Sequence, residues 1–378
     1  MDIYDELGVS KIINGYATLT SLGGSIMPAE VVAAMAEASR YFVRIDELQE
    51  KAGAKIAKWT HNQAAYISCG AAAGIALSTA ACITGLDEDK CARLPFTEGL
   101  KNEIIVHRCA GDEYNFTVRQ AGGKVVSIGS QQGASLADLE SAINPMTAAI
   151  LVYYKEQRMQ GQVPLEQQIE IAKRHGVPLI VDAAAQIPPV ENLWRFTGMG
   201  ADLVIFSGGK GLCGPQSSGL VLGRRDLIEA CKLNACPRGY IGRPMKVGKE
   251  EIVGLLTAVR HYLDLDHVQE IRIYEEQVAC ILAAFAEDAH IQVRRGFPSE
   301  AGQPMPRAEL YLDEAELGIS RDELLKRLYE DSPAISLAPA GENGMYINPQ
   351  TLRPGEEKII VARIKEILKK KPTAETQR

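Results

Sequence analysis

The sequence predicts an α/β protein, in which a mostly parallel sheet carries helices on both faces and is followed by a smaller α+β domain. Between about residues 60 and 225, short apolar runs typical of buried strands alternate with helical patterns. A chain of 378 residues is long enough for two domains. We therefore expect an N-terminal arm at 1–30, a large domain at 31–265, a small domain at 266–370 and a polar tail at 371–378.

Hydrophobic period and capping signals predict the individual elements. Pro28 begins a helix that runs to about Arg44, because proline is favoured in the first turn of a helix. The segment 46–59 has its apolar residues on one side and predicts an amphipathic helix. In the large domain we expect further helices at 74–84, 166–175, 226–233 and 250–263, and strands at 64–68, 102–107, 148–154, 177–182, 203–206 and 219–222.

Composition excludes several classes of protein. A net charge of −7 and a pI near 5.6 argue against a nucleic-acid partner, since phosphate binding needs a basic surface. The eight cysteines are scattered without a CxxC pair, so neither a disulfide framework nor a metal site is expected. The acidic N-terminus does not resemble a signal peptide, and no apolar run reaches membrane-spanning length. We expect a cytoplasmic protein with no membrane partner.

Lys210 is the residue with the clearest chemical implication. It lies in a Gly-rich turn between the apolar runs 203–206 and 219–222, with glycines at 208, 209 and 211. A lysine held between core strands beside small residues has room next to it for a flat ligand. Desolvation lowers the pKa of such a lysine toward that of a nucleophilic amine. These are the conditions that a Schiff-base lysine needs, and they predict pyridoxal phosphate as the cofactor.

A carboxylate in the right place supports this prediction. Pyridoxal phosphate needs an acid beside its ring nitrogen, so that the protonated ring can act as an electron sink. Asp182 ends the apolar run 177–182 and precedes Lys210 by 28 residues, enough for one helix and one strand. In a parallel sheet both residues then lie at carboxyl ends of strands, where ligands bind. By itself Asp182 could equally cap a helix; Lys210 and Ser207 favour the cofactor.

A second small-residue turn suits the cofactor's phosphate. Residues 69–73, Cys-Gly-Ala-Ala-Ala, lie between a predicted strand and a predicted helix. Such a turn leaves free N–H groups at the positive end of the helix dipole, which favours an anion. The alternative is that small residues are present only for close helix packing.

These motifs together resemble the fold-type I, aspartate aminotransferase-like, pyridoxal phosphate enzymes. More narrowly, the chain resembles the selenocysteine synthase-like group and, within it, the D-glucosaminate-6-phosphate ammonia-lyases. The resemblance implies a fold-type I large domain with a mostly parallel sheet and a small C-terminal α+β domain. The matching stretches are spread over the whole chain, at 8–15, 68–74, 181–185, 207–211, 242–249 and 351–356.

The resemblance also implies roles for individual residues. Asp182 and Lys210 are the catalytic pair, and the other expected cofactor contacts are Gly70, Ala71 and Ala72 to the phosphate, Ser207 as a hydroxyl donor, and His107 and Ala184 on the two ring faces. A histidine at a strand end is as often simply exposed. Gln186 is the polar candidate for the cofactor's 3-oxygen.

Substrate contacts are expected from basic residues. Arg243 and Lys246 precede the predicted helix 250–263, where basic side chains oppose the helix dipole and need an anion. An anionic substrate, or the cofactor phosphate of a neighbouring subunit, would supply it; a solvated basic loop is the alternative. The other candidates are Thr20, Arg108 and Arg353.

The expected reaction follows from the cofactor and the resemblance. Lys210 removes the Cα proton of an amino acid, a β-hydroxyl leaves, and hydrolysis gives a 2-keto acid and ammonia. The implied substrate is a small, anionic, sugar-derived amino acid such as D-glucosaminate 6-phosphate. An aminotransferase uses the same lysine and aspartate and stays open. The acidic charge disfavours a selenocysteine synthase-like transferase acting on tRNA. The resemblance implies at least a homodimer.

Overall fold

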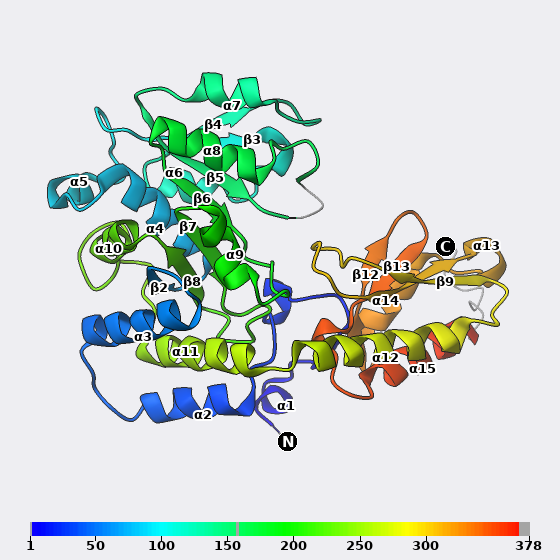
Figure 1. Ribbon diagram of the computed structural model, residues 1–378. Coiled ribbons are helices and arrows are strands. Elements are labelled where there is room, and N and C mark those ends of the chain that lie inside the picture. Colours follow the sequence, from blue (N-terminus) through cyan, green and yellow to red (C-terminus); the bar gives the residue numbers. More distant parts are fainter. Residues whose placement is uncertain (1, 156–158, 370–378) are drawn as a thin grey trace. The chain divides into compact units, whose positions relative to one another are not determined.

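The computed structural model describes residues 2–155 and 159–369 (Figure 1). The chain divides into two compact units. Unit 2 is Ser25–Asp264, and unit 1 combines Met1–Gly24 with Leu265–Arg378. The predicted tail at 371–378 lies outside the described residues.

The central sheet of unit 2 is mostly parallel, as predicted. Among the described residues it has seven strands, and only β8 runs antiparallel to its neighbours. In spatial order the strands are β2 (Ala64–Ser68), β8 (Gly219–Gly223), β7 (Leu203–Ser207), β6 (Leu179–Asp182), β5 (Thr147–Tyr153), β3 (Glu103–His107) and β4 (Lys124–Ile128). The inner strands form because Val, Ile and Leu runs are buried on both faces of a parallel sheet.

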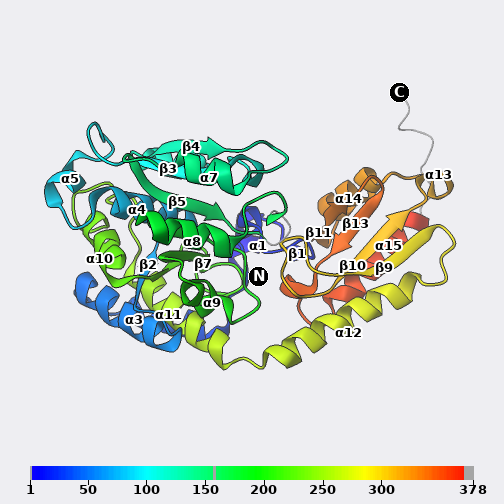
Figure 2. The same ribbon diagram turned by 45° about the horizontal axis from the view of Figure 1, so that its top comes forward.

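Helices cover both faces of this sheet (Figures 1 and 2). On one face α4 (Ala71–Thr84), α6 (Asn115–Gln120) and α10 (Arg225–Asn234) share an apolar cluster with the strands. We call this the α4 face. The opposite face carries α8 (Leu165–His175) and α9 (Asn192–Met199). The remaining helices of unit 2 are α2 (Ala29–Ala38), α3 (Ile45–Trp59), α5 (Glu88–Arg93), α7 (Leu136–Ala142) and α11 (Lys249–Asp264), of which α11 packs on α2 and α3.

Unit 1 is built on a second sheet, which is antiparallel. Its strands are, in order, β12 (Ala338–Ala340), β13 (Gly344–Ile347), β10 (Arg307–Leu312) and β9 (Ile291–Gly296). An apolar cluster joins one face of this sheet to α12 (His267–Phe285), α14 (Arg321–Glu330) and α15 (Glu356–Lys369). β1 (Ile12–Asn14) pairs in parallel with β11 (Ala334–Ser336), so the N-terminal segment, expected as an arm, contributes a strand to this unit. The short helices of unit 1 are α1 (Ile3–Leu7) and α13 (Glu314–Leu317).

Within 2–155 and 159–369, no helix combines the length and the apolar character that crossing a membrane requires.

The contact between α3 and β2 gives a first test of the fold. Gly53 lies on the buried side of α3, and a Cβ added there would meet the carbonyl oxygen of Ala65 in β2. We expect Gly53→Ala to destabilise the protein by about 1–3 kcal/mol, because the helix must move off the strand. Chemical denaturation measures this change.

Gly198 provides the matched control. It lies in α9, and a Cβ built on it meets nothing within 4 Å. Gly198→Ala should leave stability unchanged or raise it by up to about 1 kcal/mol, the helix preference of alanine over glycine. Equal losses in both variants would contradict the packing of α3 on β2.

Candidate active site

One edge of the unit 2 sheet gathers the ends of several strands. β2, β7, β6 and β5 run in the same direction, so their carboxyl ends meet at this edge. Across β8, Ser68 and Ser207 are both paired with Gly219. Asp182 is paired with Ile205 on one side and with Tyr153 on the other. Residues far apart in the sequence therefore lie side by side at this edge, which is where open α/β sheets bind ligands.

Asp182 is a buried carboxylate at the centre of this edge. Only 9% of the residue is exposed, and its Oδ1 accepts a hydrogen bond from the Ala184 N–H at 3.1 Å. Burial raises the pKa of Asp182 to about 6, although the Ala184 N–H, Lys210 and Lys155 all act to lower it. Asp182 lies on the α4 face, because Ile180 two residues earlier belongs to that cluster.

Lys210 lies within electrostatic reach of Asp182. Burial lowers the pKa of the Lys210 ammonium, and the Asp182 carboxylate partly restores it. The structure thus brings together the two residues on which the sequence prediction depends. A neutral amine is available on Lys210 nearer to physiological pH than on an exposed lysine.

The glycines around Lys210 allow its turn to pack closely against neighbouring backbone. A Cβ on Gly208 would meet Ser218 Oγ, and one on Gly211 would meet the Ile187 carbonyl. The turn is closed by hydrogen bonds from Cys213 N–H to Lys210 O at 2.9 Å and from Gly214 N–H to Gly208 O at 2.8 Å. These glycines permit close backbone packing, which fixes the lysine turn.

The turn before α4 has the features of a phosphate site. Gly70 precedes α4 with φ of +120°, a conformation that favours glycine, and no side chain caps this helix start. The first N–H groups of α4, from Ala71 and Ala72, have no partner within the helix. A Cβ on Gly219 would come within 2.5 Å of the Gly70 carbonyl carbon, so the turn packs directly on β8.

Ser207 lies near this turn. It is two residues beyond Ile205, which belongs to the α4 cluster and would contact a Cβ on Gly74 in the first turn of α4. Because strand side chains alternate, Ser207 lies on the same face as Ile205. Its N–H donates to the Ala184 carbonyl at 3.2 Å. A hydroxyl and uncapped amides thus lie on one side of Asp182 and Lys210.

His107 does not join this group. Ile104 and Val106 of β3 belong to the α4 cluster, so alternation places His107 on the opposite face. The residue is 1% exposed, its Nε2 accepts from the Val163 N–H at 3.4 Å, and burial lowers the pKa of His107 to about 4. The structure gives His107 a place in the core beneath the loop before α8, not beside Asp182. Arg108 follows it and is exposed.

Two neighbours of Asp182 were also expected to contact the cofactor. Ala184 supports Asp182 through its N–H and accepts from the Ser207 N–H, so its backbone links β6 to β7. Gln186 is buried, and its carbonyl accepts from Asn192 Nδ2 at 2.6 Å.

The predicted basic loop is exposed. Arg243 and Lys246 are both exposed, and Arg243 Nη1 lies 3.2 Å from Cys236 Sγ. The loop is attached to α10 and α4 through Gly242, where a Cβ would meet Ala235 and Leu77.

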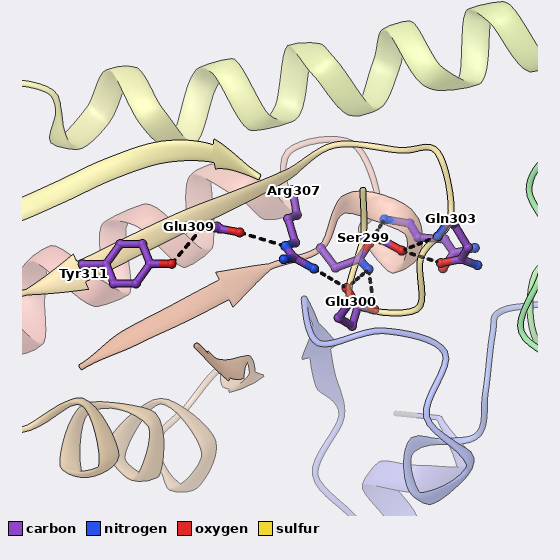
Figure 3. A network of polar contacts seen from close by, with 8 residues as sticks. Ser299, Glu300, Gln303, Arg307, Glu309 and Tyr311 are labelled. Atoms are coloured by element: carbon purple, nitrogen blue, oxygen red, sulfur yellow. Dashed lines mark hydrogen bonds and ion pairs between the residues drawn. The ribbon is translucent and has the colours of Figure 1, made fainter. Parts of the chain in front are cut away.

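Thr20 and Arg353 belong to unit 1. Arg353 is exposed, and its N–H donates to Glu356 Oε2 at 2.8 Å at the start of α15. Among the described arginines of unit 1, Arg307 is buried, and its Nε donates to Glu309 Oε1 at 3.1 Å (Figure 3). Its guanidinium carbon lies 3.9 Å from the centre of the Tyr346 ring. Glu309 also accepts from Tyr311, and Glu300 accepts from Asn348.

Sequence reasoning missed two residues beside Asp182. Tyr153 is its register partner on β5; burial and the nearby Asp182 raise the pKa of its phenol, which donates to Asn115 at 3.1 Å. Lys155 follows β5 and lowers the pKa of Asp182. The strand-end rule that identified Asp182 applies equally to Lys155, but the sequence does not show that β5 adjoins β6.

Comparisons with known proteins identify the family to which the chain belongs. A profile of SelA, L-seryl-tRNA selenium transferase, matches residues 115–283. D-glucosaminate-6-phosphate ammonia lyase of Salmonella typhimurium is 35% identical, over 97% of this chain and 98% of the relative. The chain belongs to the same family as this lyase. Another member, 5'-C-glycyluridine monooxygenase-decarboxylase of a Streptomyces species, is 33% identical over 97% of this chain and 92% of its own.

Solved structures agree with the family. A structure of D-glucosaminate-6-phosphate ammonia-lyase has a TM-score of 0.85 and 33% identity, covering 98% of this chain and 99% of its own. A serine palmitoyltransferase solved with its pyridoxal phosphate is 15% identical over 94% of this chain and 87% of its own, with a TM-score of 0.58, a likeness that shows the fold alone. Membership of this family confirms the predicted fold-type I class and the predicted cofactor.

The raised pKa of Asp182 predicts that this carboxylate, when ionised, destabilises the coenzyme-free protein. Its pKa rises from 3.8 to about 6, so the ionised form destabilises the coenzyme-free fold. The cost is absent below about pH 4, grows up to pH 6 and is complete above it. We expect Asp182→Asn to stabilise the coenzyme-free protein by up to about 3 kcal/mol at pH 7.5, and by much less at pH 4.5.

Denaturant titrations at the two pH values measure this effect. Asp202→Asn is the control, since Asp202 accepts from Arg224 at 2.7 Å and from the Leu179 N–H at 2.8 Å, and its loss should destabilise. If Asp182→Asn is less stable than the wild type at pH 7.5, the ionised Asp182 carboxylate does not destabilise the coenzyme-free protein.

Proposed function

We propose that this chain is a pyridoxal phosphate-dependent ammonia-lyase that acts on a β-hydroxy-α-amino acid derived from a sugar, such as D-glucosaminate 6-phosphate. The observation that carries the proposal is the pairing of Asp182 with Lys210 at one sheet edge, in a chain 35% identical over nearly its whole length to such a lyase. The products are a 2-keto acid and ammonia.

The residues at the edge fit pyridoxal phosphate. The Asp182 carboxylate is buried and its pKa is raised, so a protonated ring nitrogen beside it would offset the cost of its desolvation. The uncapped amides of Ala71 and Ala72, together with Ser207, suit a phosphate. When bound, the coenzyme supplies an electron sink that stabilises negative charge at the substrate's α-carbon.

Lys210 performs the proton transfers. Its buried amine, with a lowered pKa, first holds the coenzyme aldehyde and then accepts the Cα proton of the substrate. With that proton Lys210 becomes an ammonium again, which can assist departure of the β-hydroxyl. The fixed turn around Lys210 keeps the amine at one position during both transfers.

Two other reactions are alternatives for the sheet edge that carries Asp182 and Lys210. An aminotransferase needs the same lysine and aspartate. The 33% identity to a monooxygenase-decarboxylase, over 92% of that relative, favours an oxidative decarboxylation as the second candidate. A transferase acting on tRNA is disfavoured by the net charge of −7.

The deciding experiment measures ammonia released from D-glucosaminate and D-glucosaminate 6-phosphate. We expect ammonia and a 2-keto acid in equal amounts, without an added 2-keto acid acceptor and without oxygen. Lys210→Ala should abolish the release and the visible absorbance of the bound coenzyme. Turnover only with an acceptor would indicate an aminotransferase. Oxygen-dependent release of carbon dioxide would indicate a monooxygenase-decarboxylase.

We also propose that the active form is a homodimer in the cytoplasm. Supporting the compartment, all eight cysteines are free thiols, as expected where disulfides are reduced. Supporting the dimer, Arg243 and Lys246 are exposed cations on a loop attached to α10 and α4, and an anion from a second chain would balance their charge. The coenzyme phosphate of a second copy is such an anion.

Mixing two inactive variants tests the dimer. Lys210→Ala lacks the catalytic amine, and Arg243→Gln lacks the cation that would act on the partner. In a mixed dimer, the site with Lys210 receives Arg243 from the other chain, so we expect recovery of about a quarter of wild-type activity. The control is Arg238→Gln, an exposed arginine whose Nη1 donates to the Lys232 carbonyl at 3.1 Å, which should stay active. No recovery on mixing, or a monomeric mass in light scattering, would refute the exchange.

A further inference from the structure

The strand that ends at Asp182 lies between two strands that are each followed by a lysine. Lys210 follows β7, whose Ile205 is paired with Asp182. Lys155 follows β5, whose Tyr153 is paired with Asp182 on the other side. The Tyr154 N–H donates to the Asp182 carbonyl at 2.9 Å, which fixes the chain just before Lys155 against the end of β6.

Both ammonium groups act on the same carboxylate. Lys210 and Lys155 each lower the pKa of Asp182, against the larger effect of burial. Other titratable groups on this side include Tyr153 on β5, and Tyr114 and Arg119 on or next to α6, which act on Tyr153. Asp182 is thus an acid shared by two cations, and the proposed function employs only one of them.

The order of groups along the edge matches the substituents of the coenzyme. Around its ring, the aldehyde carbon is opposite the nitrogen, and the phosphate arm and the phenolic oxygen flank the aldehyde on either side. The phosphate site, at the start of α4, lies on the β2 side of Asp182, and Lys210 follows β7. The phenolic oxygen then falls on the β5 side, where the chain continues into Lys155.

We propose that Lys155 is a positioning residue of the coenzyme site, an ammonium that faces the phenolic oxygen and keeps it ionised. The inference rests on the proposed function, since it assumes the same coenzyme at the same edge. A cation beside this oxygen disfavours a further positive charge on the ring and its imine. Lys155 therefore sets the pH at which the bound coenzyme gains a proton.

The pH titration of the bound coenzyme's visible absorbance tests this role. Lys155→Gln removes the charge and keeps most of the length, so the transition should move up by about one pH unit. Lys155→Arg keeps the charge and should titrate close to the wild type. Lys155→Met is a second neutral variant, and it should shift like Lys155→Gln if charge rather than hydrogen bonding is responsible. Lys101→Gln, an exposed lysine, is the surface control.

The outcomes separate the two proposals. If the wild-type protein binds no coenzyme, the proposed function itself fails. A different outcome is that the wild type binds the coenzyme while Lys155→Gln and Lys155→Met, where they fold, leave the pH transition of its absorbance unchanged. In that case Lys155 has no such role and the proposed function stands. A shift of the same size in Lys155→Arg would equally overturn the inference, because the charge is then not what matters. Circular dichroism of each variant checks its folding.

Discussion

A desolvated carboxylate at the end of an inner strand is the constraint on which the candidate active site depends. Asp182 is nine-tenths buried, and burial raises its pKa to about 6. An ion in such a place is tolerated only where donors and cations surround it. One backbone N–H and two lysines do so here, contributed by the Ala184 turn, the end of β5 and the turn after β7. A parallel sheet is the architecture that brings those three segments to one edge.

Rigidity of the edge comes from backbone packing rather than from side chains. Gly208 and Gly211 hold the lysine turn against Ser218 and Ile187, and Gly219 lets the turn at Gly70 lie directly on β8. Each of these positions would clash with a Cβ. The turn at Gly70 and the turn around Lys210 are therefore fixed relative to Asp182 by the sheet itself, which suits a site whose reacting groups must stay in register with a flat ring.

What the sequence could predict was local. The pairing of Asp182 and Lys210 follows from two strand ends and one Gly-rich turn, and the α4 turn follows from small residues before a helical pattern. His107 shows what the sequence could not predict. The last residue of a strand can lie on either face of the sheet, and in β3 the His107 side chain lies on the face opposite that of Asp182. Lys155 shows a second limit, since the adjacency of β5 and β6 is a property of the sheet order. The buried Arg307, stacked on Tyr346, depends likewise on pairing between β10 and β13.

The two family members also constrain where reaction specificity lies. One is named a lyase and the other a monooxygenase-decarboxylase, yet each aligns with 97% of this chain and over more than nine-tenths of its own length. An added domain therefore cannot account for the difference between them. An electron sink such as pyridoxal phosphate does not by itself choose which bond at the α-carbon breaks, because that choice depends on which bond lies perpendicular to the ring. Side chains that orient the substrate and set the charge around the ring must decide it, and in this chain the strand-end cations beside Asp182 are among the groups placed to do so.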